Sequence, residues 1–165
     1  MKIETERLLM IPMTYEFIVD KLEGKQSSIE ENGVKIIKEY WQESDIIDIL
    51  PMIKDYLKDK EPDGFTPWLI ILKKCNRVIG SCGCHGEPNQ NNEVEIGYGI
   101  DSDCRRNGYA TEAVKGLVSW LFEKKKVNNI TAECNIDNMG SIKVLKNIGM
   151  IEIKRDEELI YWNIN

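Results

Sequence analysis

The chain has 165 residues, of which 42% are hydrophobic and 30% charged, so it is long enough to bury a core without disulfides or a structural metal. The formal net charge of −6 argues against nucleic-acid binding, which needs cations to neutralise phosphates, and no apolar run is long enough to cross a membrane. Five scattered cysteines suit reduced thiols, and the N-terminus lacks the apolar stretch of a secretory signal, so we expect a cytoplasmic protein.

The first half of the chain predicts strands, surface helices and one hairpin. Short apolar runs bounded by turn residues such as Pro12 are typical of strands, whereas apolar residues at three- and four-residue intervals indicate helices. Asn76 and Arg77 separate two strand-like segments by a tight turn, which predicts an antiparallel hairpin. The expected strands are residues 7–11, 68–72 and 78–84, and the expected helices are residues 14–22 and 46–57.

The second half of the chain adds strands that alternate with helices. The most regular helix is expected from Gly108 to about Lys126, because its apolar residues fall on one face and its polar residues on the other. Asn138 is placed to cap a second helix, which Gly149 is placed to end. Further strands are expected at residues 94–100, 129–135, 151–153 and 159–164.

The order of these elements predicts one α/β domain over residues 1–165. Antiparallel strands are followed by strand, helix, strand, helix and a final hairpin. That order places one parallel crossover in a mixed, mostly antiparallel sheet flanked by helices. Because no repeat, low-complexity tract or linker interrupts the chain, nothing in the sequence divides it further.

The segment between the strand at 94–100 and the helix from Gly108 carries the strongest sign of chemistry. The first-turn N–H groups and the dipole of a helix attract anions, and Gly108 and Ala110 leave room for a phosphate to approach the backbone. Arg105 and Arg106 add guanidinium groups that match phosphate oxygens. The segment therefore predicts a pyrophosphate site, although a basic turn between a strand and a helix is also compatible with plain surface.

The same segment carries a family resemblance. Arg-x-x-Gly-x-Ala at 105–110, followed by Thr111-Glu112-Ala113, resembles the acetyl-coenzyme A motif of the GCN5-related N-acetyltransferases. Most of the chain outside residues 20–67 is similar to the ribosomal-protein N-acetyltransferase branch, at residues 4–9, 79–80, 95–98, 138–141 and 148–150. The resemblance implies the acyl-CoA N-acyltransferase fold, with acetyl-coenzyme A as cosubstrate. The cofactor contacts it implies are Ile100, Arg105, Arg106, Asn107, Gly108, Tyr109, Ala110, Thr111 and Asn138.

The resemblance also implies direct transfer of acetyl to a primary amine in a ternary complex, without a covalent enzyme intermediate. Glu95 matches the acid before Ile-Gly-Tyr in similar proteins and is the candidate base for the amine proton, with Glu93 as the alternative. Ser141 is the candidate proton donor to the leaving thiolate. A solvated strand position would equally explain Glu95, and helix capping would explain Ser141 and Asn138.

The identity of the acceptor stays open at this point. A protein N-terminus, an aminoglycoside or polyamine, and a free amino acid all carry a suitable amine, and a homodimer is the oligomer expected from similar proteins. The rival interpretation is a catalytically inactive sensor or interaction protein that binds coenzyme A. Binding of coenzyme A without acetyl transfer to a broad amine panel would distinguish it.

Cys82, Cys84 and His85 predict neither a metal site nor a catalytic cysteine. Strand alternation puts the two thiols on one face and the imidazole on the other, and a fourth metal ligand is missing. We therefore expect no metal, and we interpret the thiols as small buried apolar side chains.

Overall fold

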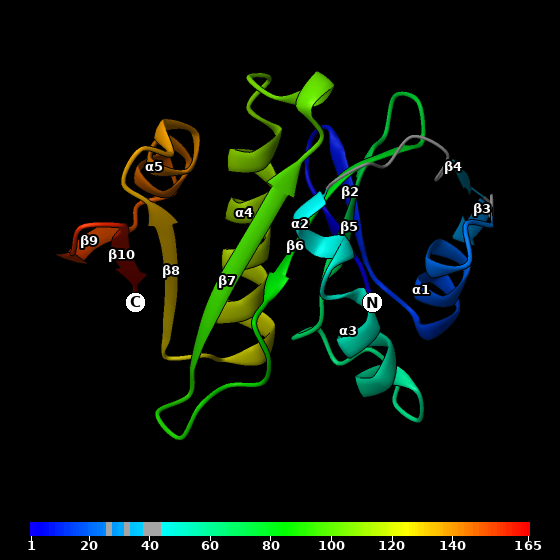
Figure 1. Ribbon diagram of the computed structural model, residues 1–165, viewed down its shortest axis with the longest axis horizontal. Helices are drawn as coiled ribbons and strands as arrows, with labels where there is room; N and C mark the ends of the chain where they lie inside the picture. Colours follow the sequence, from blue (N-terminus) through cyan, green and yellow to red (C-terminus); the bar gives the residue numbers. More distant parts are fainter. Residues whose placement is uncertain (26–27, 32–33, 38–43) are drawn as a thin grey trace.

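The computed structural model, which describes residues 1–25, 28–31, 34–37 and 44–165, has an α/β architecture (Figure 1). Its sheet runs in the order β1-β2-β5-β6-β7-β8-β10-β9, and the β3–β4 hairpin joins it through β6. Along that order every pair is antiparallel except β7 and β8, which confirms the predicted mixed sheet with one parallel crossover. The strands are β1 Ile3–Glu4, β2 Leu8–Pro12, β3 Ser28–Glu31, β4 Val34–Ile37, β5 Trp68–Leu72, β6 Arg77–Cys84, β7 Glu93–Ile100, β8 Asn129–Asn135, β9 Ile151–Arg155 and β10 Leu159–Ile164.

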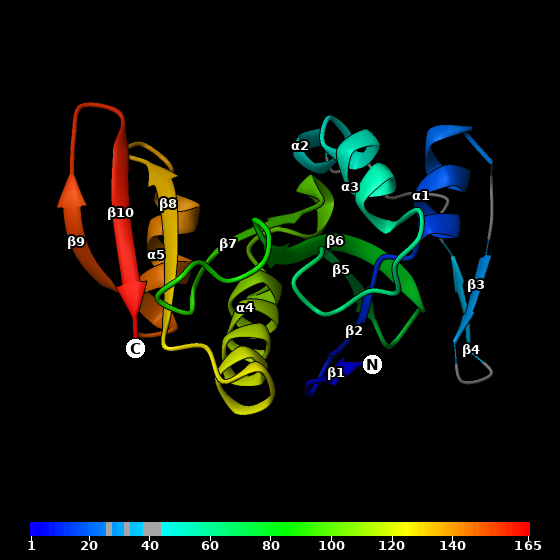
Figure 2. The ribbon, with the colours of Figure 1, turned by 90° about the horizontal axis from the view of Figure 1, so that it is seen from below.

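The helices cover both faces of this sheet. Thr14 caps the first helix as expected, because its hydroxyl accepts the Phe17 N–H at 3.2 Å. Asn138 caps the last helix in the same way, through the Ser141 N–H at 3.0 Å. Figure 2 shows α2 and α3 on the face of the sheet opposite α4. The helices are α1 Tyr15–Leu22, α2 Ser44–Ile47, α3 Leu50–Leu57, α4 Tyr109–Trp120 and α5 Met139–Asn147.

Two apolar cores lie on opposite faces of the sheet, and β5 contributes to both. Trp68 and Ile70 pack into the core beneath α4, whereas Leu69 and Ile71 pack into the core with α1 and α3. A strand that is buried on both faces has apolar side chains at consecutive positions, which is why apolar and polar residues do not alternate over residues 68–72. β6 also contributes to both cores, through Val78 on one face and Ile79 on the other, whereas β7 contributes to the core beneath α4 through Val94, Ile96 and Ile100.

The structure differs from the sequence-based expectation in three places. The helix predicted over residues 46–57 is two helices, because Pro51 lacks an N–H and can only occupy the first turn of a new helix, α3. The helix predicted to reach Lys126 ends its α-helical part at Trp120 and continues as a π-helical turn over Leu121–Lys125. β1 and the β3–β4 hairpin were not predicted, because strands of two to four residues carry too few positions to show a pattern.

Candidate functional site

A turn with left-handed residues connects β7 to α4. After Ile100 the chain makes a 3₁₀ turn at Ser102–Cys104 and then passes through Arg106 and Gly108, whose φ angles are 63° and 80°. Glycine adopts that conformation without steric cost, and at position 108 a Cβ atom would lie 3.4 Å from the Arg7 guanidinium. The N-cap residue offers no side-chain hydrogen bond, so the first-turn N–H groups of α4 stay available to an anion.

The predicted cofactor-binding residues of this turn have different surroundings. Arg105 and Arg106 are both exposed, and Arg105 Nε donates to the Ile100 carbonyl at 2.9 Å. Asn107 Nδ2 instead donates to the carbonyls of Cys104 and Arg105 at 3.1 and 2.9 Å, so this side chain closes the turn. Of the remaining predicted contacts, Ile100 ends β7, and Tyr109, Ala110 and Thr111 open α4.

An ion pair that sequence reasoning missed braces this turn from the N-terminal strands. Arg7 Nε lies 2.6 Å from Glu112 Oε2, and Arg7 Nη1 donates to the Asn107 carbonyl at 2.9 Å. The same guanidinium lies 4.6 Å from the centre of the Tyr109 ring, and the Thr5 hydroxyl donates to Glu112 Oε1 at 2.6 Å. Burial acts to raise the pKa of Glu112, but the hydrogen bonds from Thr5 and Arg7 outweigh it and hold that pKa below its ordinary value.

Next to the turn, β7 and β8 pair only at their beginnings. The parallel register joins residues 93–95 to residues 129–131, and beyond it the two strands diverge (Figure 1). Tyr98, on the diverging part of β7, donates its hydroxyl to the Ser141 carbonyl at 3.3 Å, across to the start of α5. Asn138 and Ser141 therefore lie at the far side of the divergence, opposite the strand that carries Glu95.

Glu95 lies at the last position at which β7 pairs with β8, and its side chain is held by a partner that we did not predict. Its Oε1 lies 2.8 Å from His85 Nδ1, and the His85 N–H donates to the Glu95 carbonyl at 2.8 Å. The imidazole covers Gly97, where a Cβ atom would meet His85 Nε2 at 2.6 Å. β6 and β7 are antiparallel, with Cys84 opposite Ile96, and the next position of the same register sets His85 opposite Glu95. Working out this hairpin register from the sequence would have revealed the His85–Glu95 pair.

Glu93, the alternative base, is engaged in a different way. Its carboxylate accepts from Asn89 Nδ2 at 3.0 Å and from Asn129 Nδ2 at 3.1 Å. The hydrogen bond from Asn89, followed by that from Asn129, lowers the pKa of Glu93, which makes it a weaker proton acceptor. These bonds tie the start of β7 to β8 and to the preceding loop.

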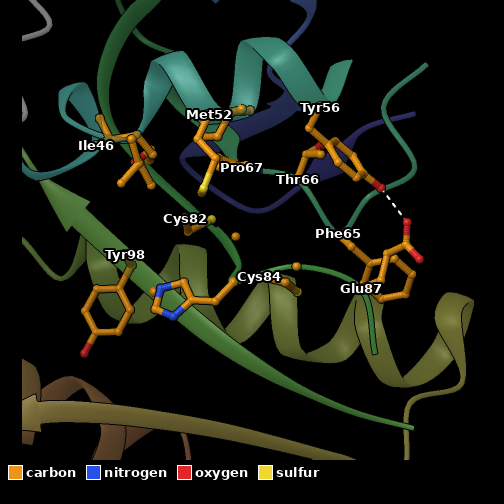
Figure 3. Close-up of a pocket in the computed structure, with 17 residues that line it drawn as sticks. Ile46, Met52, Tyr56, Phe65, Thr66, Pro67, Cys82, Cys84, Glu87 and Tyr98 are labelled. Atoms are coloured by element: carbon orange, nitrogen blue, oxygen red, sulfur yellow. Dashed lines mark hydrogen bonds between the residues drawn. The ribbon is translucent and has the colours of Figure 1, made fainter. Parts of the chain in front are cut away.

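A cavity of about 590 Å³ opens beside His85, between α2, α3 and β6 (Figure 3). Its volume falls in the range typical of small-ligand sites. Tyr98 lines it near β7, and Cys82 and Cys84 line its floor. Both thiols are buried, and burial raises the pKa of Cys84 to about 12, so this thiol stays neutral.

Across the described ranges, no group of three or more His, Cys, Asp or Glu side chains could hold a metal ion. The same ranges contain no helix that is both long and apolar enough to span a membrane. All five cysteines are free thiols, as the odd count and scattered spacing predicted.

Comparison with known proteins extends over nearly the whole chain. The family described as "Acetyltransferase (GNAT) domain" matches residues 30–151. The uncharacterised N-acetyltransferase YjdG of Bacillus subtilis (strain 168) is 31% identical over 161 residues, which are 97% of this chain and 95% of that protein.

Solved structures share the fold at lower identity. An acetyltransferase of the GNAT family from Bacillus anthracis superposes with a TM-score of 0.70 at 20% identity, covering 99% of this chain and 98% of that one. Mycobacterium smegmatis RimJ in complex with CoA-disulfide superposes with a TM-score of 0.64 at 16% identity, covering 95% of this chain and 81% of that one. At these identities the likeness speaks for the fold alone.

Proposed function

Because this chain belongs to the GNAT family of N-acetyltransferases, we propose that it moves acetyl from acetyl-coenzyme A to a primary amine in a ternary complex. One observation carries the proposal: an exposed, basic, left-handed turn at the start of α4 lies directly beside the divergence of β7 and β8. The turn offers N–H groups and arginines to a pyrophosphate, and the diverging strands offer unpaired backbone to an extended arm. RimJ, a structural neighbour, was solved with a coenzyme A disulfide, which supports the same ligand here.

The residues around the turn fit a pyrophosphate. Gly108 lacks a side chain where the phosphates would approach, and the exposed guanidinium groups of Arg105 and Arg106 supply the countercharge. Arg7 does not compete for that ligand, because Glu112 and the Asn107 carbonyl already engage it. Asn138 has its Oδ1 committed to the α5 cap, which leaves its amide N–H groups for the arm of the cosubstrate.

The amine must be neutral before it can attack, and the His85–Glu95 pair is placed to take its proton. With Nδ1–H directed at Glu95, His85 Nε2 carries the lone pair that accepts it. The neutral amine nitrogen then bonds to the thioester carbon while the carbon–sulfur bond breaks and the electron pair leaves with sulfur. The proton that nitrogen loses as the amide forms is balanced by the proton that the thiolate gains to become coenzyme A. Glu95 stabilises the imidazolium that forms, so the predicted carboxylate acts through the histidine that lines the cavity.

The departing thiolate needs a hydrogen-bond donor, and two hydroxyls lie near the divergence: that of Tyr98, which reaches from β7 to the start of α5, and that of Ser141. Burial raises the pKa of Tyr98 to about 12, so its hydroxyl keeps its proton across the ordinary pH range. Ser141 is half-buried, and its backbone N–H donates to Asn138 Oδ1 in the helix cap. The cap therefore does not use the Ser141 hydroxyl. Because the Tyr98 hydroxyl already donates to the Ser141 carbonyl, we propose the Ser141 hydroxyl as the donor to sulfur.

The decisive experiment is calorimetric titration of the protein with acetyl-coenzyme A, coenzyme A and ATP, repeated for Gly108→Val. The branched side chain would prevent a phosphate from approaching the backbone at position 108. The loss of one charge-assisted hydrogen bond should raise the Kd for coenzyme A by about tenfold or more. Gly24→Val is the matched control, because Gly24 has a φ of 68° and open space around it but lies far from the turn in sequence.

Selective binding of coenzyme A that is weakened in Gly108→Val and kept in Gly24→Val supports the site. Wild-type protein that does not bind coenzyme A refutes the proposal. Binding followed by no acetyl transfer to any amine in a broad panel, and no thioester hydrolysis, identifies the inactive coenzyme A-binding protein instead.

A further inference from the structure

The walls of the cavity beside His85 are mostly apolar, and this limits what can enter it. Six of the side chains that line it come from three separate stretches: Ile49, Met52 and Ile53 around α3, Phe65 and Pro67 before β5, and Cys84 on β6 (Figure 3). Ile49 and Met52 are 39% and 68% exposed although both are large and apolar. Exposed apolar side chains that rim a ligand-sized cavity indicate an apolar ligand.

The charged groups of the lining are already engaged. Among the described lining residues, the ionisable side chains that can carry charge near neutral pH are His85 and Glu87. His85 is bound to Glu95 at 2.8 Å, and Glu87 accepts from the Tyr56 hydroxyl at 2.6 Å and lies 3.9 Å from Lys60 Nζ. A second ammonium group would therefore enter the described walls without a free carboxylate to pair with. 

One polar atom of the wall lacks a partner. Thr66 is 6% exposed, and its hydroxyl makes no hydrogen bond within the part of the chain that the structure describes. The oxygen itself is buried, so a ligand in the cavity does not contact it directly, and the wall at Thr66 faces a ligand as an apolar surface.

We infer that the acceptor is a small primary amine with an apolar aromatic or branched body and no second positive charge. The inference rests on the proposed acetyl transfer, because it places the amine at His85 Nε2 and the body among Ile49, Met52 and Phe65. The apolar walls also favour the neutral form of the amine, which is the form that attacks.

The test measures coenzyme A release with phenethylamine, spermidine, kanamycin and an alanine-initiated tetrapeptide as probes. Phenethylamine is expected to give the highest kcat/KM of the four. Met52→Lys puts a cation at the rim and removes apolar contact, so it raises the KM for phenethylamine by about tenfold or more. Ile151→Lys is the matched control, since Ile151 is also 68% exposed but lies on β9, outside the cavity.

Calorimetry with acetyl-coenzyme A on each protein separates the two proposals. Binding of acetyl-coenzyme A with faster transfer to spermidine, kanamycin or the peptide overturns the inferred acceptor and leaves the acetyltransferase standing. Binding with no transfer to phenethylamine, or equal KM values for Met52→Lys and Ile151→Lys, overturns it as well. Absence of acetyl-coenzyme A binding in the wild type refutes the function on which the inference rests.

Discussion

Replacing Gly97 by alanine should separate His85 from Glu95 without touching either side chain. A Cβ atom at position 97 would lie 2.6 Å from His85 Nε2, whereas ordinary contacts begin at 3.4 Å, so the ring has to move by about 0.8 Å. Moved along the Nδ1–Oε1 direction, that shift would lengthen the 2.8 Å hydrogen bond to about 3.6 Å, beyond hydrogen-bonding distance. The imidazole is 55% exposed and free to swing, so the fold survives and the pair is lost.

General-base catalysis contributes about 10²- to 10⁴-fold, and a displaced base retains part of it, so kcat for Gly97→Ala should fall by about 10- to 100-fold. The assay is steady-state release of coenzyme A with the best amine, accompanied by calorimetry with acetyl-coenzyme A, whose Kd should stay unchanged. In a His85→Ala background the clash is gone, so adding Gly97→Ala should cost little more. A wild-type kcat for the single variant, or an equal loss in both backgrounds, would refute the role given to the pair.

Two further predictions concern stability. Glu112→Gln removes the carboxylate that Arg7 binds and should lower the free energy of unfolding by about 1–2 kcal/mol at pH 7 in urea titrations. The pKa of Glu112 is lowered in the folded state, so the stability difference should reach its full size above the ordinary carboxyl pKa of about 4.3. It should shrink as the pH falls through the lowered pKa of the folded state. A stability difference that does not change with pH would contradict the ion pair. Gly64→Ala places a Cβ atom 2.3 Å from the Trp120 ring at a φ of 93° and should destabilise by about 2–4 kcal/mol. Gly24→Ala has a similar φ and open space, and should cost about 1 kcal/mol, so equal losses at the two glycines would contradict the packing argument.

The elements that were predictable from sequence are those whose determinants lie within a few residues of one another. The strand at residues 129–135 and the Asn138 cap appear where expected, because periodicity and capping are local properties. The turn at 105–110 was predictable for the same reason, because its arginines, its glycine and the start of the helix follow one another in the sequence. Family membership followed from that turn and was confirmed by comparison over nearly the whole chain.

The contacts that sequence did not reveal depend on register and topology. Arg7 and Glu112 are 105 positions apart and meet only because β2 and α4 pack together. The sequence places His85 beside Cys82 and Cys84, whereas its partner Glu95 lies on the facing strand and meets it only through the register of β6 with β7. A long-range pair of this kind carries no local signature, so only the fold brings it into view.

The proposed site therefore has two parts, one predictable from a local stretch of sequence and one that only the fold assembles. The proposed cofactor side is built from one continuous stretch, from the end of β7 through the start of α4, together with the cap of α5. The proposed acceptor side is assembled from α2, α3, the segment before β5, and β6. Much of it falls within residues 20–67, where the family resemblance is weakest. Ile46 and Ile53 of the cavity pack into the core with α1 and α3, whereas Cys82 and Cys84 share the core beneath α4 with Ile100 and Tyr109 of the turn. Family membership thus supports acetyl-coenzyme A as the proposed donor, whereas the proposed amine has to be argued from the apolar walls beside His85.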